Sequence, residues 1–374
     1  MSGPSADLAP LAVVGGRLAT ELLDVTSDLA ALDSTGFWAV VLPFEGPAIC
    51  ARFGRVRAAR PWPGAAWQGP APDAWTTSLD GHGFREGVRA IRDAIAAGDV
   101  YQVNLTRRMS APLPKGADIA ALGAALAEGN PAPYAAVVRL PALDCHVASA
   151  SPERFLRRDG ALVSSAPIKG TAPDEHGLTG KDRAENVMIV DLVRNDLSRV
   201  CEYGSVAVPH LLAVEHHPGL VHLVSTVTGR LRPGLGWSDA IAATFPPGSV
   251  SGAPKSSALT TIRDMEPVAR GPYCGAIGWV DTDRGGAELA VGIRTFWAER
   301  TADGGRVLRF GTGAGITWGS DPDAEWAETE LKAARLVGLT GTRRAARTNA
   351  PGSTPPAGPP PPWRPEVAAP RRPR

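Results

Sequence analysis

The sequence predicts an α+β fold with antiparallel sheets, and three observations support this prediction. The 374 residues are enough for one large domain or two small ones with an ample core. Segments with helical spacing and segments with strand alternation follow one another in mixed order, without the regular βα alternation that favours a parallel sheet. The segment 274–299 contains two apolar runs around a turn at 283–286, which is typical of an antiparallel hairpin.

The first elements along the chain are predicted to be strands. Residues 1–75 contain short apolar runs, such as 37–44, which are broken by Gly and by Pro-Trp-Pro. Apolar residues then recur at helical spacing over 84–98, where Gly98 can end the helix. The remaining expected strands are 100–108, 134–140, 144–151, 220–231 and 306–317, and the remaining expected helices are 182–200, 256–267 and 322–337.

The last predicted helix has a clear start, with Asp321 as N-cap and Pro322 at the first helical position. We expect three segments in the chain: a short β-rich region over 1–75 that packs on the main domain, a catalytic domain over 76–342, and a tail over 343–374. The tail is Pro-rich with few apolar residues, so we expect it to be disordered.

The composition excludes several classes of function. With 39 basic and 38 acidic residues the net charge is +1, which gives no reason to expect a nucleic acid or an anionic membrane as partner. No apolar run reaches the ~20 residues of a membrane span, and the N-terminus lacks the pattern of a signal peptide. Cys50, Cys145, Cys201 and Cys274 form no CxxC pair, so neither a disulfide framework nor a zinc site is expected. A reduced, cytoplasmic protein is the simplest expectation.

The segment 167–171, PIKGT, places Lys169 between apolar neighbours and shortly before an acidic helix. A lysine that acts as a nucleophile needs such a setting. At pH 7 the neutral amine costs about 4.6 kcal/mol, because the ordinary lysine pKa is near 10.4. Burial or a nearby cation lowers this cost. Taken alone, however, a lysine at the end of a strand is the commoner explanation of Lys169.

Two predicted helices carry acidic residues that can hold a metal. Asp182 and Glu185 lie one turn apart at the start of the first of these helices. A single face of the last helix also carries two carboxylates, although this face taken alone is most simply solvated and ion-paired. Two acidic faces on separate helices can hold one Mg²⁺, which binds a few carboxylates together with waters and substrate oxygens. The face of the last helix consists of Glu325, Glu328, Lys332 and Arg335.

Other residues suit a small anionic substrate. The segment 311–315, GTGAG, can present backbone N–H groups from a loop to an anion, although it lacks a dinucleotide-binding or P-loop spacing. Tyr273 and Arg294 supply a hydroxyl and a guanidinium for a carboxylate. Glu153 follows a strand and a proline, from which a carboxyl can enter a cleft. His222 lies in an apolar strand, where a core histidine is the commoner explanation.

Taken in order, these motifs resemble the chorismate-utilising enzymes, and the resemblance covers about Phe84–Leu339. It implies an α+β scaffold of stacked antiparallel β-sheets flanked by helices, which converts chorismate to anthranilate, 4-amino-4-deoxychorismate, isochorismate or salicylate with Mg²⁺ as cofactor. The motifs are SASPERF, PIKGT, AENVMIVDLVRNDL, HLVSTVTG, FPPGSVSGAPK, RGPYCGAIGW, AVGIRT and GAGITWGSDPDAEWAETELKAARL.

The resemblance also implies a role for each candidate residue. Catalysis would involve Lys169, with Glu153 as general acid and base at the departing C4 hydroxyl and His222 as the histidine of the HLVS motif. The Mg²⁺ that grips the ring carboxylate would be held by carboxylates of the two acidic helices. The expected metal ligands are Glu185, Glu328 and Glu325, and the expected substrate-binding residues are Tyr273, Arg294, Gly313, Gly315, Lys332 and Thr171.

Two positions indicate which reaction the resemblance implies. Isochorismate- and salicylate-forming relatives have a general-base lysine where this chain has Gln102, and an amide cannot remove a proton from water. Relatives that form anthranilate have alanine where this chain has Lys169. The lysine implies amination of chorismate at C4, which leads to 4-aminobenzoate and folate, and anthranilate formation is the alternative. A non-catalytic binding protein of the same family would be expected to have lost these charged residues.

The ammonia must come from another protein. No cysteine of the chain lies in the G-x-C-x-G turn that carries the nucleophile of a glutaminase. The resemblance therefore implies a separate glutamine amidotransferase subunit as partner, with free ammonium as a substitute.

Overall fold

The computed structural model describes residues 8–62, 64–217 and 220–341. Contacts group the chain up to Thr342 into one unit, and the predicted tail 343–374 lies outside the described residues. The strands are β1 (Leu11–Val14), β2 (Arg17–Thr26), β3 (Phe37–Leu42), β4 (Ile49–Ala58), β5 (Thr76–Thr77), β6 (Gln102–Pro112), β7 (Tyr134–Leu140), β8 (Cys145–Ser151), β9 (Arg154–Asp159), β10 (Leu162–Ala166), β11 (Ile168–Ala172), β12 (Ala207–His217), β13 (Leu220–Arg230), β14 (Gly252–Ala253), β15 (Ala276–Asp281), β16 (Gly286–Val291), β17 (Thr295–Arg300) and β18 (Arg306–Ile316). The helices are α1 (Gly81–Ala97), α2 (Ile119–Gly129), α3 (Gly180–Ser198), α4 (Trp237–Thr244), α5 (Lys255–Met265) and α6 (Pro322–Thr340).

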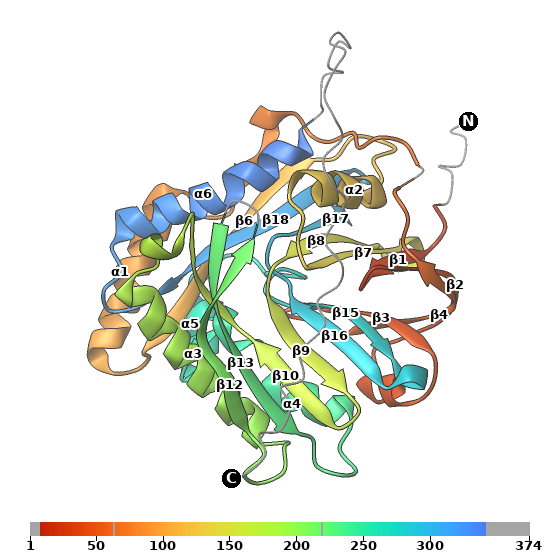
Figure 1. The fold of residues 1–374 in the computed structure, drawn as a ribbon. Coiled ribbons are helices and arrows are strands. Elements are labelled where there is room, and N and C mark those ends of the chain that lie inside the picture. The colour runs from red at the N-terminus through yellow and green to blue at the C-terminus, as the bar shows by residue number, and fades with distance from the viewer. Residues whose placement is uncertain (1–7, 63, 218–219, 342–374) are drawn as a thin grey trace, which may run out of the picture. The chain divides into compact units, whose positions relative to one another are not determined.

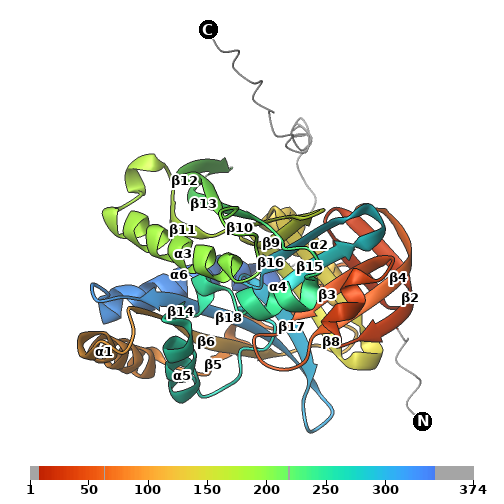
Figure 2. The same ribbon diagram turned by 90° about the horizontal axis from the view of Figure 1, so that it is seen from below.

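The strands form two stacked layers that belong to one hydrogen-bonded sheet (Figure 1). One layer runs β6–β18–β17–β8–β7–β1, and the other runs β2–β4–β3–β15–β16–β9–β10–β13. Within the described residues every pairing is antiparallel, and the β1–β2 hairpin joins the layers. Figure 2 shows the layers one above the other. The predicted α+β fold with stacked antiparallel sheets is therefore confirmed.

The largest apolar core fills the space between the two layers. Val138 and Trp297 enter it from one layer, while Val40 and Leu289 enter it from the other. Strand β3, which lies in the predicted N-terminal region 1–75, is buried at all six positions. It pairs with β15 of the later sequence, so this region supplies inner strands of the sheet.

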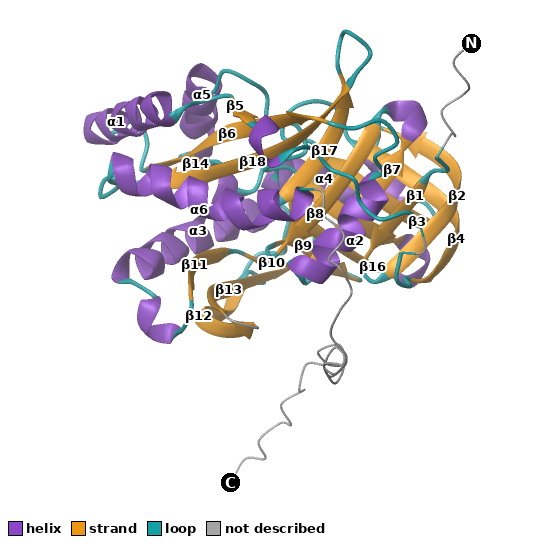
Figure 3. Cartoon of the chain, turned by 90° about the horizontal axis from the view of Figure 1, so that it is seen from above, coloured by secondary structure: helices purple, strands orange, loops and turns teal. Residues whose placement is uncertain are grey.

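Helices pack against the strands and bring the acidic residues to the sheet. Helices α1 and α5 pack with β6 and β18 in one apolar cluster, and α2 and α6 pack with β8, β17 and β18 in another. Helix α3 contacts β13, which belongs to the other layer. Figure 3 shows α3 and α6 among these helices, each beside its own strands. The two predicted acidic helices therefore rest on different halves of the sheet.

Local sequence signals explain the ends of the predicted helices. Asp80 caps α1 by accepting a hydrogen bond from the Gly83 N–H, and Gly98 ends the helix in the left-handed conformation, as predicted. Asp321 caps α6 by accepting from Asp323 and Ala324, with Pro322 at the first helical position. The predicted hairpin turn is also confirmed, since Gly285 adopts a φ of +67° between β15 and β16.

Several elements were not predicted. Helix α2 is made almost entirely of Ala, Leu and Gly, so its apolar residues show no single face, and α4 has only eight residues. The strand predicted over 306–317 is confirmed, and the interpretation of 311–315 within it as a loop is wrong. Strand β18 continues without interruption to Ile316 and pairs with β6 along its whole length, because alternate small residues fit against that neighbour. None of the described helices is long and apolar enough to cross a membrane.

Candidate active site

Lys169 lies at a distortion in strand β11 that turns its side chain inward. The pairing of β11 with β13 shifts register between Ile168 and Thr171, as in a β-bulge. Gly170 supports this distortion with a φ of +82°, and a Cβ at this position would lie 2.9 Å from the Cβ of Asp182. Gly170 and Thr171 are therefore part of a bulge within a strand. The Lys169 side chain is only 13% exposed, so this lysine is not the surface residue that the simplest interpretation suggested.

Alternate glycines of β18 form a surface without side chains opposite Lys169. Thr312, Ala314 and Ile316 point to the helix-covered face, and Gly311, Gly313 and Gly315 point to the other face. A Cβ on Gly315 would lie 3.0 Å from Nζ of Lys169. A larger residue at Gly315 would therefore fill the space that the lysine amine faces.

The side chain of Gln102 faces the same space. A Cβ on Gly315 would lie 2.7 Å from its Nε2. Gln102 is fully buried, and neither its Oε1 nor its Nε2 has a hydrogen-bond partner. A buried amide without partners is destabilising by about 1–3 kcal/mol, and such groups are rare in native proteins. The unpaired amide beside Lys169 therefore indicates a place where a polar ligand binds.

Glu153 is a buried carboxyl near the same lysine. It follows β8, and its side chain is hydrogen-bonded to Ser249 and to the backbone of Ile168. Burial raises its pKa to about 7, although these hydrogen bonds and the positive charge of Lys169 act in the opposite direction. A carboxyl with a pKa near 7 can exchange a proton at physiological pH, which suits general acid–base chemistry.

Thr171 and His222 form a hydrogen-bonded pair across two strands. They are register partners on β11 and β13. The Thr171 Oγ1 and the His222 Nδ1 are 2.8 Å apart, and His222 is 3% exposed. Fixing one ring nitrogen in this way also fixes the orientation of the imidazole.

Tyr273 and Arg294 lie where the glycine surface of β18 ends. A Cβ on Gly311 would lie 2.0 Å from the ring of Tyr273, so glycine is needed for the tyrosine to pack there. Burial raises the pKa of the Tyr273 hydroxyl well above its ordinary value, and the neighbouring Cys274 raises it further, so the hydroxyl remains a donor. Burial lowers the pKa of Arg294, and the nearby Arg335 lowers it further. A partly buried guanidinium beside a second cation is suited to an anion.

The backbone of β18 offers further donors near Lys332. Strand β17 pairs with β18 only as far as Phe310, so the edge beyond that point has no strand partner within the described residues. In an antiparallel pair, facing residues alternate between pairs that exchange backbone hydrogen bonds and pairs that do not. Gly313 faces Thr106 of β6, and the Thr106 N–H donates to Glu266, so these two residues form a pair without backbone hydrogen bonds. The backbone N–H and C=O groups of Gly313, and those of Gly315 two residues later, therefore point to the open edge of the strand. The Nζ of Lys332 donates to the Gly313 carbonyl over 3.1 Å.

The carboxylates of the two acidic helices are each paired with a lysine. Oε2 of Glu185 lies 3.5 Å from Nζ of Lys169, and Oε1 of Glu328 lies 2.5 Å from Nζ of Lys332. Burial alone would raise the pKa of Glu328, but the charge and hydrogen bond of Lys332 lower it more, so the net shift is downward. Glu328 is thus favoured in the ionised form that a metal requires.

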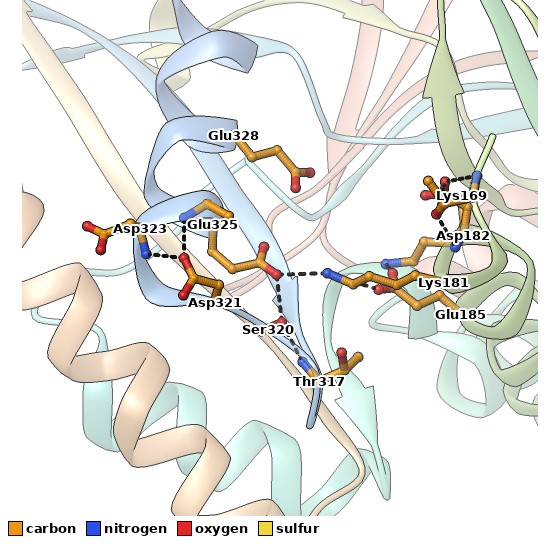
Figure 4. A network of polar contacts seen from close by, with 12 residues as sticks. Lys169, Lys181, Asp182, Glu185, Thr317, Ser320, Asp321, Asp323, Glu325 and Glu328 are labelled. Atoms are coloured by element: carbon orange, nitrogen blue, oxygen red, sulfur yellow. Dashed lines mark hydrogen bonds and ion pairs between the residues drawn. The ribbon is translucent and has the colours of Figure 1, made fainter. Parts of the chain in front are cut away.

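The Glu325 side chain is almost completely buried, and a lysine of α3 forms an ion pair with it. Its Oε1 accepts hydrogen bonds from Nζ of Lys181 over 2.9 Å and from the Ser320 hydroxyl over 2.6 Å. Lys181 also lies 3.7 Å from Oε1 of Glu185. Figure 4 shows Lys181 reaching from α3 towards Glu325 of α6. Partial burial lowers the pKa of Lys181, but the hydrogen bond and charge of Glu325 raise it more, so Lys181 remains an ammonium.

The donor chemistry of these carboxylates fits Mg²⁺, which prefers hard oxygen ligands. Their arrangement is nevertheless that of ion pairs, because no three or more His, Cys, Asp or Glu side chains gather around one point within the described part of the chain. Asp182, which also lies on the first acidic face, is engaged elsewhere, since it accepts hydrogen bonds from Thr179 and completes a capping box at the start of α3.

Sequence reasoning missed two residues of this region. Lys181 precedes Glu185 by four positions, a spacing that places both on one helix face, but its contact with Glu325 spans 144 residues. The partner of Glu153, Ser249, comes from a segment between α4 and β14. Ser249 lies within the FPPGSVSGAPK motif. Neither pattern indicates the contacts with Glu325 and Glu153, which arise only in the fold.

The chain matches the family model described as chorismate binding enzyme over residues 63–338. It is 41% identical to anthranilate synthase component 1 of Streptomyces coelicolor over 72% of this chain and 53% of that protein. It is 38% identical to aminodeoxychorismate synthase component 1 of Escherichia coli over 70% of this chain and 58% of that protein. The chain therefore spans somewhat more than half the length of these relatives.

Solved structures show the same fold. The menaquinone-specific isochorismate synthase of Escherichia coli superimposes with a TM-score of 0.73 at 20% identity, covering 90% of both chains. Anthranilate synthase component I of Streptococcus pneumoniae superimposes with a TM-score of 0.68 at 23% identity, covering 90% of this chain and 94% of that one. These similarities concern the fold.

Proposed function

The chain belongs to the chorismate-binding enzyme family, and we propose that it aminates chorismate at C4 to give 4-amino-4-deoxychorismate. The observation that carries this proposal is the position of Lys169. Its amine lies beside the unpaired Gln102 amide and the glycine surface of β18. The family resemblance implies alanine at this position in the relatives that form anthranilate. A lysine here favours a route in which an amine of the enzyme takes part.

In this route the Lys169 amine attacks C2 of the chorismate ring. The two ring double bonds shift towards C4, and the C4 hydroxyl leaves as water with a proton from Glu153. Ammonia then attacks C4, the double bonds shift back, the C2–N bond breaks to release the lysine amine, and the new C4 ammonium group returns a proton to the Glu153 carboxylate. The net reaction exchanges the C4 hydroxyl for an amino group and retains the enolpyruvyl group. The pKa of about 7 for Glu153 supports its role as the acid.

The remaining residues are suited to holding a dianion. Arg294, the Tyr273 hydroxyl and the open N–H groups of Gly313 and Gly315 would bind the enolpyruvyl carboxylate, with Lys332 nearby. Thr171 would contact the substrate while orienting His222. Gln102 would then gain the polar partner that it lacks. With chorismate held in this way, the reacting atoms C2 and C4 would lie between Lys169 and the carboxyl of Glu153.

Mg²⁺ is the cofactor that this proposal implies. When bound, it would neutralise the ring carboxylate of chorismate and withdraw electrons from the ring. Glu185 and Glu328 would hold it, with Glu325 beside them, and the ionised state of Glu328 supports this role.

Ammonia would come from a separate glutamine amidotransferase subunit. All four cysteines of the chain are buried. Burial raises the pKa of three of them to about 12 and also raises that of the fourth, Cys201. A thiol that hydrolyses glutamine must form a thiolate, which these environments disfavour. Amination by this chain alone would therefore depend on free ammonium.

Anthranilate formation is the alternative, because relatives with that name reach the same identity. Product analysis separates the two activities. The purified chain is incubated with chorismate, Mg²⁺ and ammonium, and the products are identified by chromatography and mass spectrometry. We expect 4-amino-4-deoxychorismate, whereas anthranilate as the main product would overturn the proposal.

A further inference from the structure

The acidic site is formed by the carboxylates of Glu185 on α3 and of Glu325 and Glu328 on α6. It contains as many lysine side chains as carboxylates. Lys169 pairs with Glu185, and Lys332 pairs with Glu328. Lys181 differs from these two because it contacts two carboxylates from different helices, at 2.9 Å from Glu325 and 3.7 Å from Glu185. The three negative charges are thus balanced by three positive charges before any metal is present.

Lys181 is also the link between the two acidic helices. Within the described residues, its ion pair with Glu325 is the one that joins α3 to α6. The two helices rest on different layers of the sheet, through β13 and β18. In this structure the group that lies between Glu185 of α3 and Glu325 of α6 is the Lys181 ammonium (Figure 4).

We propose that Lys181 is a resident cation of the acidic site, which holds Glu185 and Glu325 together without a metal and leaves when Mg²⁺ binds. The proposal rests on the Mg²⁺ dependence proposed above. It assigns a competing role to a residue that contributes no metal ligand.

The geometry supports competition at this position. Mg²⁺ binds its oxygen ligands at about 2.0–2.1 Å and excludes an ammonium from the same oxygens. Like charges at such distances repel, so the two cations are not stable together. The Lys181 side chain is 47% exposed and can turn to solvent without disturbing the core, whereas Lys169 is only 13% exposed. Lys332 is equally exposed, at 48%, but its pair with Glu328 lies within α6, so Lys181 is the exposed cation that stands between the two helices.

The experiment measures metal affinity without substrate and without turnover. Mn²⁺, a paramagnetic substitute for Mg²⁺, is titrated into the purified chain and followed by electron paramagnetic resonance, with Mg²⁺ as competitor. Lys181→Met removes the charge and keeps a long side chain, while Lys181→Arg keeps the charge. Lys115→Met, at an exposed position, is the matched control.

We expect Lys181→Met to bind Mn²⁺ about tenfold more tightly than the wild-type chain, because a like charge beside the metal is removed. Lys181→Arg and the control should resemble wild type. Lys181→Met should also have a lower melting temperature without metal, because Glu325 loses its cation, and added Mg²⁺ should restore it.

Equal or weaker Mn²⁺ binding by Lys181→Met would overturn the proposal and show Lys181 to be a structural ion-pair partner or a support for metal binding. Absence of binding in every variant would also overturn it, because removing the resident cation should reveal the site. Neither result decides the proposed function, which the product assay tests separately.

Discussion

The Nζ of Lys169 lies 3.5 Å from Oε2 of Glu185, so the proposed nucleophile and a proposed metal ligand share one ion pair. Attack by the lysine requires a free amine, and the Glu185 carboxylate is in contact with that amine. Substitution of Glu185 would therefore disturb both the metal site and the nucleophile. Glu328, which pairs with Lys332 instead, gives a cleaner test of the metal.

Glu328→Gln should lower turnover at least about tenfold, because the metal loses a charged ligand while the helix keeps its shape. The measurement is the initial rate as a function of Mg²⁺ concentration, together with a thermal unfolding curve. Asp323→Asn, an exposed change on the same helix, is the control and should behave as wild type. Undiminished activity of Glu328→Gln at limiting Mg²⁺ would remove Glu328 from the metal site.

The source of nitrogen gives a second prediction. The purified chain should aminate chorismate with ammonium and should be inactive with glutamine, because its cysteines are buried thiols with raised pKa values. The measurement is product formation with each nitrogen donor in parallel. Product formed from glutamine by the chain alone would contradict the need for an amidotransferase partner.

The burial of Glu153 predicts a dependence of stability on pH. Its pKa is about 7 in the folded chain against an ordinary value of 4.5. Between these values the folded chain keeps a proton that the unfolded chain has lost, so the contribution of Glu153 to stability falls as the pH rises and is lost above about 7. The contribution of Glu153 to the free energy of unfolding therefore differs by roughly 3 kcal/mol between a pH well below 4.5 and a pH well above 7.

Glu153→Gln removes this titration. The free energy of unfolding of both chains is measured in urea at about pH 5 and about pH 8. The value for the variant minus the value for wild type should be about 2–3 kcal/mol larger at the higher pH. Comparing the two chains at each pH cancels the other titrating groups. A stability difference that is the same at both pH values would show that Glu153 does not titrate in this range. The variant should also lose most activity, because an amide cannot donate the proton.

Gln102→Leu should separate stability from function. Both polar atoms of the Gln102 side chain are buried without a partner, so an apolar side chain of similar size should stabilise the chain by about 1–3 kcal/mol. The same change should reduce amination, because the polar contact to the substrate or to ammonia is lost. A variant that is less stable, or that is fully active, would show that the amide has another role.

The sequence predicted the local features of the fold well. Caps such as Asp321 and stops such as Gly98 depend on neighbouring residues, and both are confirmed. The bulge at Lys169 depends on how β11 meets β13, and the position of Lys181 depends on α6. These features were not predicted, because they arise from contacts between segments far apart in the chain. Family resemblance identified the residues, and the fold shows how they face one another.

The proposed route requires the Lys169 amine to form a covalent bond with C2 of the substrate. Lys169→Ala should abolish most formation of 4-amino-4-deoxychorismate while chorismate still binds. The space that the shortened side chain leaves beside C2 of the ring should allow a trace of amination at that carbon. Lys169→Arg should be no better, because a guanidinium stays protonated and cannot attack. Lys115→Ala, an exposed change, is the matched control and should be fully active.

The most direct measurement is the intact mass of the wild-type chain after incubation with chorismate and Mg²⁺ without ammonium. We expect an adduct with the mass of chorismate less one water, which digestion maps to the peptide that contains Lys169 and which is absent from Lys169→Ala. An unmodified wild-type chain, together with nearly wild-type production of 4-amino-4-deoxychorismate by Lys169→Ala, would rule out the covalent route and leave the lysine without a chemical role.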